Sequence, residues 1–130
     1  RRQRQMCIRD RFKVVTDKEL INNISDLSIH GSWMKTAPLI IVIFLDNACS
    51  YDRLKDIQSC GAVMQNMMLT AHSLDIGSCW IGEILPKSKE VKQVLKLNDE
   101  SLELMGIVLF GHKSSRMIDP GRKRIESFLL

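Results

Sequence analysis

The sequence predicts an α+β fold in which a β-sheet is covered by helices on both faces. Residues 39–45 form an unbroken apolar run rich in β-branched side chains, which is typical of a strand buried on both faces. Residues 54–74 are apolar at helical spacing around more than one side, which indicates a long core helix. A length of 130 residues is sufficient for one domain with a single core.

The first predicted elements are a short strand and a helix. Residues 12–15 are rich in β-forming side chains, and Thr16 and Glu19 have the spacing of a capping box, in which the Thr16 hydroxyl accepts a hydrogen bond from the Glu19 backbone N–H. The helix that follows has one apolar face and is expected to end near His30 and Gly31. That face consists of Leu20, Ile21, Ile24 and Leu27. A loop over residues 30–38 then leads to the buried strand.

The long helix at residues 54–74 follows a polar connection and precedes a short loop. Because its apolar positions cover more than one stripe, we expect it to be buried on two sides, the second being a candidate subunit interface. Gly77 is expected to end the helix in a left-handed conformation, which glycine adopts without steric cost. Gly82 closes the loop 78–82, whose backbone could approach a planar ligand with no side chain in between.

The C-terminal half contains a short helix, a second buried strand and a tail. Pro86 is suited to the first turn of a helix, and Val91, Val94 and Leu95 give that helix an apolar face. Residues 102–110 form another apolar run, which predicts a second buried strand ended by Gly111. Residues 112–130 are expected to form a loop and a basic tail.

Composition and charge exclude several classes of protein. The 45% hydrophobic and 26% charged residues are ordinary for a globular protein. The longest apolar run is far shorter than the roughly 20 residues that span a bilayer, and no signal-peptide pattern precedes it, so we expect a cytoplasmic protein with no membrane partner. The net charge of +4 is concentrated at the two ends of the chain. Excluding residues 1–11 removes the positive excess, so we expect no nucleic-acid partner.

Residues that could act as acid, base, nucleophile or metal ligand show no recognisable pattern. The four cysteines have neither CxxC spacing nor a histidine at metal-ligand spacing, so we expect reduced, structural thiols and no metal site. They are Cys7, Cys49, Cys60 and Cys79. The histidines have no sequence partner, and no paired carboxylates or phosphate-binding glycine-rich loop are evident. We therefore expect no catalytic side chain.

The clearest indication of function lies in residues 65–82, which read QNMMLTAHSLDIGSCWIG. This run resembles a segment of the nitroreductase family, whose members are dimeric, FMN-dependent oxidoreductases. Asp75 stands where the family usually has glycine, and aspartate tolerates left-handed geometry better than most residues. Residues 12–19 and the tail from Arg122 resemble two further family segments. The resemblance implies a nitroreductase-like mixed sheet flanked by helices.

The same resemblance implies a reaction. NAD(P)H would deliver hydride to FMN and leave, and an electron-poor small molecule such as a nitroaromatic or a quinone would then take its place in a ping-pong mechanism. The cofactor carries the redox chemistry in such enzymes, and the protein supplies orientation, electrostatics and exclusion of water. A homodimer is implied as well.

The resemblance also indicates which residues contact the cofactor. In the family, the segment after the long helix lies against the flavin ring with backbone groups near N5. The matching residues here are Cys79, Trp80, Ile81 and Gly82. A basic residue near the C-terminus of family members helps to bind the flavin phosphate, sometimes across the dimer, and Arg122 and Lys123 match it. Arg122 is the better candidate, because a forked guanidinium suits a phosphate dianion.

The N-terminal end does not resemble the family. Residues 1–11 have no periodicity and resemble a translated sequencing adapter, so we expect them to be a non-native leader and residues 12–130 to form a partial nitroreductase-like domain, incomplete at its N-terminus. In the family, phosphate-binding arginines and a Pro-Ser-x-x-Asn loop precede the first strand, and nothing in residues 1–11 matches them. Such a fragment would lack phosphate contacts and need not be active.

Two alternative functions stay open at this point. A reductive dehalogenase or a flavin-consuming enzyme of the same family would differ mainly in a substrate-covering insertion, and none is visible in the sequence. A non-catalytic α/β ligand-binding or dimerisation module would use the methionine-rich helix only as an interface. The colour of the purified protein separates the last alternative from the flavoenzymes.

Overall fold

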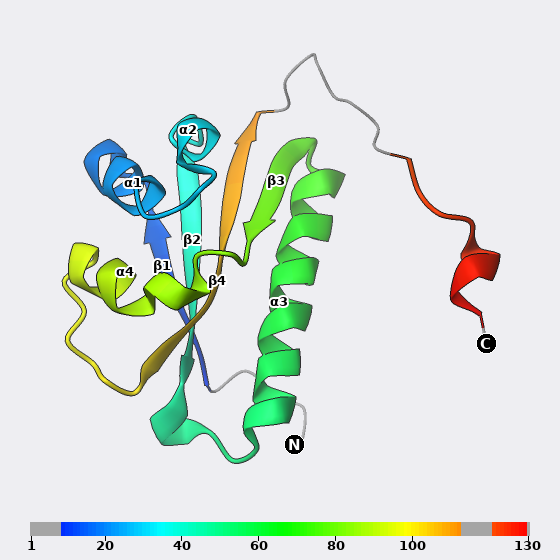
Figure 1. Ribbon diagram of the computed structural model, residues 1–130. Helices are drawn as coiled ribbons and strands as arrows, with labels where there is room; N and C mark the ends of the chain where they lie inside the picture. Colours follow the sequence, from blue (N-terminus) through cyan, green and yellow to red (C-terminus); the bar gives the residue numbers. More distant parts are fainter. Residues whose placement is uncertain (1–8, 113–120, 130) are drawn as a thin grey trace.

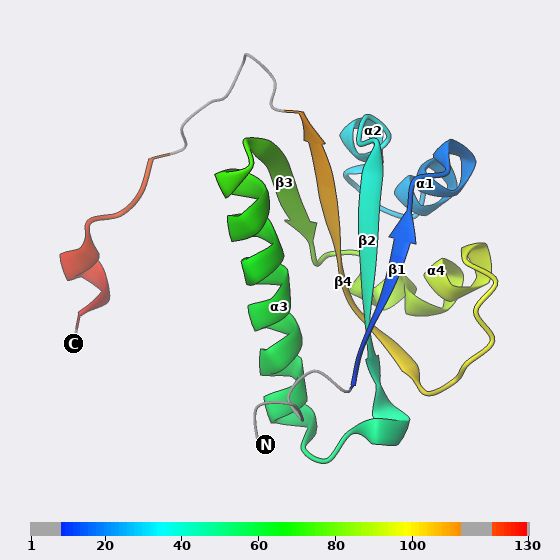
Figure 2. The same cartoon turned by 180° about the vertical axis from the view of Figure 1, so that it is seen from behind.

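A computed structural model describes residues 9–112 and 121–129 and has an α+β architecture in three layers. The sheet has the order β1-β2-β4-β3, with β1 Asp10–Val15, β2 Leu39–Asp46, β3 Ile76–Ile81 and β4 Leu102–His112. Figures 1 and 2 show α3 (Arg53–Ser73) on one side of the sheet. The other side carries α1 (Lys18–Ser25), α2 (Gly31–Met34) and α4 (Ser88–Val94). The α+β class is confirmed, and all strand pairs among the described residues are antiparallel, where the resemblance implied a mixed sheet.

The two faces of the sheet bury separate cores, because side chains alternate along each strand. Ile40, Val42 and Phe44 of β2 pack with the short helices, while Ile43 and Leu45 pack under α3. The prediction that residues 39–45 form a strand covered on both faces is therefore confirmed. The strand at 102–110 is also confirmed, and it continues through Gly111 to His112.

The first strand and helix form as expected but begin at other residues. β1 starts at Asp10 instead of residue 12, and Asp10 pairs with Leu45. The cap of α1 is Asp17 and not Thr16, because Asp17 has extended backbone and its carboxylate accepts a hydrogen bond from the Leu20 N–H at 2.9 Å. The helix ends at Ser25, before the predicted end near His30, and α2 occupies part of the segment that was expected to be a loop.

The long helix α3 is confirmed, and within the described chain it is buried on one side only. Burial of its second side in a subunit interface stays a prediction. Its fully buried residues are Asp56, Cys60, Met64 and Ala71, which lie on one face against the sheet. On other faces the side chains of Leu69 and Leu74 are 56% and 66% exposed. No described residue covers this outer face.

The turn from α3 into β3 differs from the prediction. The left-handed residue is Asp75, with φ of 59°, and Gly77 lies in the strand. The segment expected to be a loop at residues 78–82 is mostly an edge strand, because residues 76–81 pair with β4 from Ile76 opposite His112 to Ile81 opposite Ile107. This pairing is non-local, so local residue preferences did not reveal it. The helix after Pro86 is confirmed as α4.

None of the helices in residues 9–112 and 121–129 is both long and apolar enough to cross a lipid bilayer.

A buried carboxylate at the start of α3 predicts a pH-dependent stability. Asp56 accepts hydrogen bonds from the Ser50 hydroxyl at 2.7 Å, the Tyr51 N–H at 3.3 Å and the Arg9 guanidinium at 2.8 Å. Burial raises the pKa of this carboxyl, but the Ser50 hydrogen bond and the Arg9 charge outweigh it and hold the pKa below its usual value. A lowered folded-state pKa adds stability that is present above the unfolded pKa of about 4 and is lost as the pH falls through the folded value.

We therefore expect the free energy of unfolding of the Asp56→Asn variant to fall less between pH 7 and acid pH than that of the wild type. Urea unfolding at several pH values measures the difference. Glu100→Gln is the control, because the Glu100 side chain is 98% exposed. Parallel pH profiles for wild type and Asp56→Asn would contradict the assignment.

Candidate cofactor site

The centre of the site is a short turn that leaves the edge strand β3, here called the Gly82 loop (residues 82–84). Ile81 and Ile84 are 3% and 0% exposed and anchor the two ends of this turn in the core under the short helices. The Gly82 carbonyl accepts a hydrogen bond from the Leu85 N–H at 3.2 Å, which closes the turn. The backbone of Gly82 and Glu83 is therefore held in place between two buried side chains.

The Gly82 loop presents open backbone donors. No described residue accepts a hydrogen bond from the backbone N–H of Gly82 or Glu83. A Cβ atom at Gly82 would meet only the Trp80 indole nitrogen, at 3.7 Å, and the φ angle of Gly82 is not in the left-handed region. The fold itself therefore does not require glycine at this position. Glycine has no side chain, so a ligand can come close to the two backbone N–H donors of this loop. The edge of a planar heterocycle such as flavin carries acceptor atoms that suit such donors.

Trp80 lies beside this loop, on the α3 face of the sheet. Its indole covers Gly106 at a β-bulge in β4, where the register with β2 shifts between Ile43 and Phe44. A Cβ at Gly106 would lie 2.7 Å from the indole nitrogen and 2.9 Å from the Met64 sulfur, so only glycine leaves room for the ring. The Trp80 side chain is still 44% exposed.

Trp80 also lines a pocket of about 370 Å³ between α3 and the sheet. Buried sulfur-containing side chains, Cys60, Met64 and Met105, form part of its wall. Arg53 and Glu103 also line it and form an ion pair at 2.5 Å. The pocket is therefore apolar inside and contains one charged pair.

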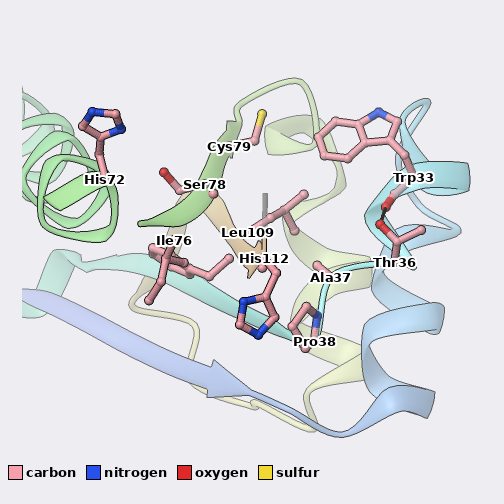
Figure 3. Close-up of a pocket in the computed structure, with 13 residues that line it drawn as sticks. Trp33, Thr36, Ala37, Pro38, His72, Ile76, Ser78, Cys79, Leu109 and His112 are labelled. Carbon is pink, nitrogen blue, oxygen red and sulfur yellow. Dashed lines mark hydrogen bonds between the residues drawn. The ribbon is translucent and has the colours of Figure 1, made fainter. Parts of the chain in front are cut away.

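Cys79 lies on the opposite face of β3 and lines a larger pocket of about 670 Å³. Figure 3 shows Trp33 and Thr36 on one side of this pocket and Ser78 and Cys79 on the other. Burial raises the pKa of the Cys79 thiol. In the other core, burial and a hydrogen bond to Asp10 raise the pKa of Cys60 to about 12. Both thiols are therefore protonated at neutral pH and poorly suited to act as nucleophiles.

The described residues contain no group of three or more histidine, cysteine or acidic side chains that could hold a metal ion.

The two basic candidates lie in the C-terminal segment, apart from the Gly82 loop. Arg122 and Lys123 are exposed, and Arg122 donates a hydrogen bond to the Gly121 carbonyl at 2.9 Å. Figures 1 and 2 show the segment with η4 (Ile125–Phe128) standing away from the sheet and helices. Of the predicted site residues, Cys79 and Trp80 lie on opposite faces of β3, Ile81 is buried in the core and Gly82 begins the loop. Arg122 and Lys123 lie apart from all four within one chain.

Two features of the site were not predicted from the sequence. Ser28 donates a hydrogen bond to Glu83, which follows Gly82, and no local signal connects two residues 55 positions apart. The bulge at Gly106 did have a signal, because an isolated glycine inside an apolar strand often marks a bulge or a close approach.

Comparisons with known proteins identify the family of this chain. The family model "Nitroreductase family" matches residues 8–112. A candidate NADH dehydrogenase/NAD(P)H nitroreductase of Archaeoglobus fulgidus is 30% identical over 106 residues, which cover 78% of this chain and 59% of the relative. A similarly named protein of Methanothermobacter thermautotrophicus is 26% identical, over 90% of this chain and 64% of the relative. The chain thus spans about three fifths of the length of these curated relatives.

Solved structures with a similar fold include members of the same type of protein. A crystal structure from Desulfovibrio desulfuricans, described as a candidate nitroreductase in complex with FMN, superimposes with a TM-score of 0.85 and 30% identity, over 94% of this chain and 71% of that chain. An NADPH:FMN oxidoreductase of Vibrio harveyi shares the fold, with a TM-score of 0.81. It is 18% identical, over 96% of this chain and 59% of that chain. With more than half of its residues matched by the family model and its sheet, long helix and following turn in place, the chain belongs to the nitroreductase family.

Proposed function

We propose that the protein to which this chain belongs is an FMN-dependent oxidoreductase that passes hydride from NAD(P)H to an electron-poor acceptor such as a nitroaromatic or a quinone. The observation that supports this most is the Gly82 loop, where two backbone N–H groups without a described acceptor stand beside an exposed indole. Family membership and the FMN-bound relative support the choice of cofactor. The ping-pong order and a cytoplasmic location stay predictions of the sequence.

The residues of this chain would bind and orient the cofactor. Bound FMN supplies the chemistry of accepting and releasing hydride. The N–H groups of Gly82 and Glu83 would donate to acceptor atoms on the ring edge, and the buried Ile81 and Ile84 keep these donors in a fixed place. Trp80 would line the site and exclude water. No side chain of this chain is assigned as acid, base or nucleophile.

The visible absorption spectrum tests the proposal. The purified chain, alone and after incubation with FMN and gel filtration, should elute with the flavin bands if the Gly82 loop binds the ring. NAD(P)H should then bleach these bands, and an added quinone should restore them. A chain with native circular dichroism that never retains FMN, even as part of a full-length protein, would refute the proposal and favour a non-catalytic module.

Arg122 is proposed to bind the FMN phosphate, with Lys123 as a weaker contributor. Loss of one charge-assisted hydrogen bond costs about 1.5–3 kcal/mol, so Arg122→Ala should weaken FMN binding roughly 10- to 100-fold. Titration of FMN fluorescence measures the dissociation constant. Arg124→Ala is a matched control two residues away, because Arg124 is already paired with Glu126 at 3.2 Å. Equal affinities for wild type and Arg122→Ala would contradict the assignment.

We also propose that two copies of the chain associate through the outer face of α3. An apolar groove of about 430 Å³ follows that face next to β3. Its lining residues include Val63, Met67, Leu74 and Phe110. The C-terminal segment carries Ile125, Phe128 and Leu129, each at least 65% exposed. A second copy would bury both apolar surfaces, and its C-terminal segment could bring Arg122 to the Gly82 loop that one chain alone leaves without it.

The dimer can be tested with one substitution. Met67→Lys should shift the molecular mass in sedimentation equilibrium from that of a dimer to that of a monomer, because a charge buried in an apolar interface costs several kcal/mol. Gln93→Lys on α4, on the other side of the sheet, adds the same exposed charge as a control. A wild-type chain that is monomeric at all concentrations would refute this interface.

A further inference from the structure

One hydrogen bond joins the Gly82 loop to the connection between α1 and α2. The Ser28 hydroxyl donates to the Glu83 carboxylate across 55 residues of sequence. The same hydroxyl oxygen accepts a hydrogen bond from the His30 backbone N–H at 3.0 Å. This second contact orients the hydroxyl, because its lone pair faces His30 and its hydrogen is then directed at Glu83.

The turn that carries Ser28 is held by several hydrogen bonds. The Ser28 N–H donates to the Ser25 carbonyl at 3.0 Å, and the Gly31 N–H donates to the Ser28 carbonyl at 3.1 Å. Ser25 is fully buried, and its own hydroxyl donates to the Ile21 carbonyl at 2.7 Å. On the other side of the contact, Ile84 is fully buried next to Glu83. The carboxylate is therefore held between two fixed parts of the backbone.

The Glu83 carboxylate has no compensating positive charge nearby. Among the described residues, no lysine, arginine or histidine lies within ion-pair distance of it, and the hydroxyl of Ser28 is its side-chain hydrogen-bond partner. The histidine of the same turn, His30, contacts this group only through its backbone N–H. The negative charge of this exposed side chain, held by the Ser28 hydrogen bond, thus stands one residue from the open N–H of Gly82.

We propose that Glu83, held by Ser28, is a positioning residue that orients the Gly82 loop toward FMN and lowers the reduction potential of the bound flavin. The inference rests on the proposed function. Hydride transfer from NAD(P)H adds two electrons and one proton to the ring and leaves NAD(P)⁺, so at neutral pH the reduced ring carries one more negative charge. A carboxylate beside the ring disfavours that added charge and so favours passing the hydride on to the acceptor.

The midpoint potential of FMN-loaded protein tests the electrostatic part. Glu83→Gln keeps the shape of the side chain and removes its charge. The variant should therefore bind reduced FMN about tenfold better relative to oxidised FMN. For a two-electron couple, this tenfold change raises the midpoint potential by about 30 mV. Ser28→Ala should shift the potential in the same direction by less, and the exposed control Glu100→Gln should leave it unchanged. A Glu83→Gln protein that retains FMN at the wild-type potential would overturn the inference.

A second readout needs no cofactor. The Leu85 amide is hydrogen-bonded to Gly82, so its hydrogen exchange reports whether the turn is closed. In the flavin-free chain, Ser28→Ala should speed hydrogen exchange at the Leu85 amide roughly fivefold. This factor corresponds to the loss of about 1 kcal/mol, the contribution of one hydrogen bond. Ser127→Ala, at a serine hydroxyl that bonds only within the C-terminal segment, is the control. Unchanged exchange would overturn the positioning role, whereas a chain that retains no FMN even as part of a full-length protein would refute the proposed function instead.

Discussion

Replacing Gly82 with valine is expected to abolish FMN retention while leaving the fold intact. The valine Cβ and its methyl groups would occupy the space over the backbone N–H groups of Gly82 and Glu83, so the ring edge could no longer reach either donor. Two lost hydrogen bonds at about 1–1.5 kcal/mol each, together with the steric clash, should weaken FMN binding by at least about 100-fold. The affinity can be measured by equilibrium dialysis of FMN against each variant.

The structure explains why the fold should tolerate this change. The nearest heavy atom to a Cβ at position 82 is 3.7 Å away, and the backbone there is not left-handed. Ser78→Val introduces the same side chain four residues earlier, in the edge strand β3, and serves as a control. We expect wild type, Gly82→Val and Ser78→Val to have nearly equal melting temperatures, and only Gly82→Val to lose FMN. Unchanged FMN content in Gly82→Val would show that the Gly82 loop does not contact FMN.

The sequence predicted best those elements whose burial leaves a strong apolar pattern. Residues 39–45 and 102–110 are largely apolar runs of strand length, and the apolar segment that forms α3 is too long for a strand. The cap of α1 was displaced by one residue, because Thr16 and Asp17 are both good capping residues and only the backbone angles at Asp17 distinguish them. Local patterns therefore fix the type of an element more reliably than its ends.

Features that depend on distant contacts were not predicted. The strand β3 contains Gly77 and Ser78, which local preferences assign to a loop, and only the partner strand β4 makes it regular. The apolar pattern of α3 indicated its outer apolar face, but a sequence pattern does not identify the surface that packs against such a face. The resemblance located Gly82, whereas the link from Ser28 to Glu83 needs the folded chain, since the two residues are 55 positions apart in sequence.

Substituting Gly31 with alanine is expected to be the most destabilising single-methyl change in the described chain. Gly31 is buried, and a Cβ there would overlap the Ser25 carbonyl oxygen and lie 3.1 Å from its carbon. These are backbone atoms that cannot rotate away, and the carbonyl already accepts the hydrogen bond from Ser28. The whole turn would have to shift, at a cost of about 3 kcal/mol, or a fall in melting temperature of roughly 10 °C for a domain of this size.

Thermal unfolding followed by circular dichroism measures this effect, with Gly61→Ala in α3 as the matched control. A Cβ at Gly61 meets no atom within 4 Å, and alanine gains up to about 1 kcal/mol over glycine within a helix, so the control should melt at or above the wild-type temperature. The same turn carries Ser28, so a folded Gly31→Ala protein below its melting temperature should also lose closure of the Gly82 loop, seen as faster exchange at Leu85. A Gly31→Ala protein that melts like the wild type would show that the turn can move, and the rigid support proposed for Glu83 would then lose its basis.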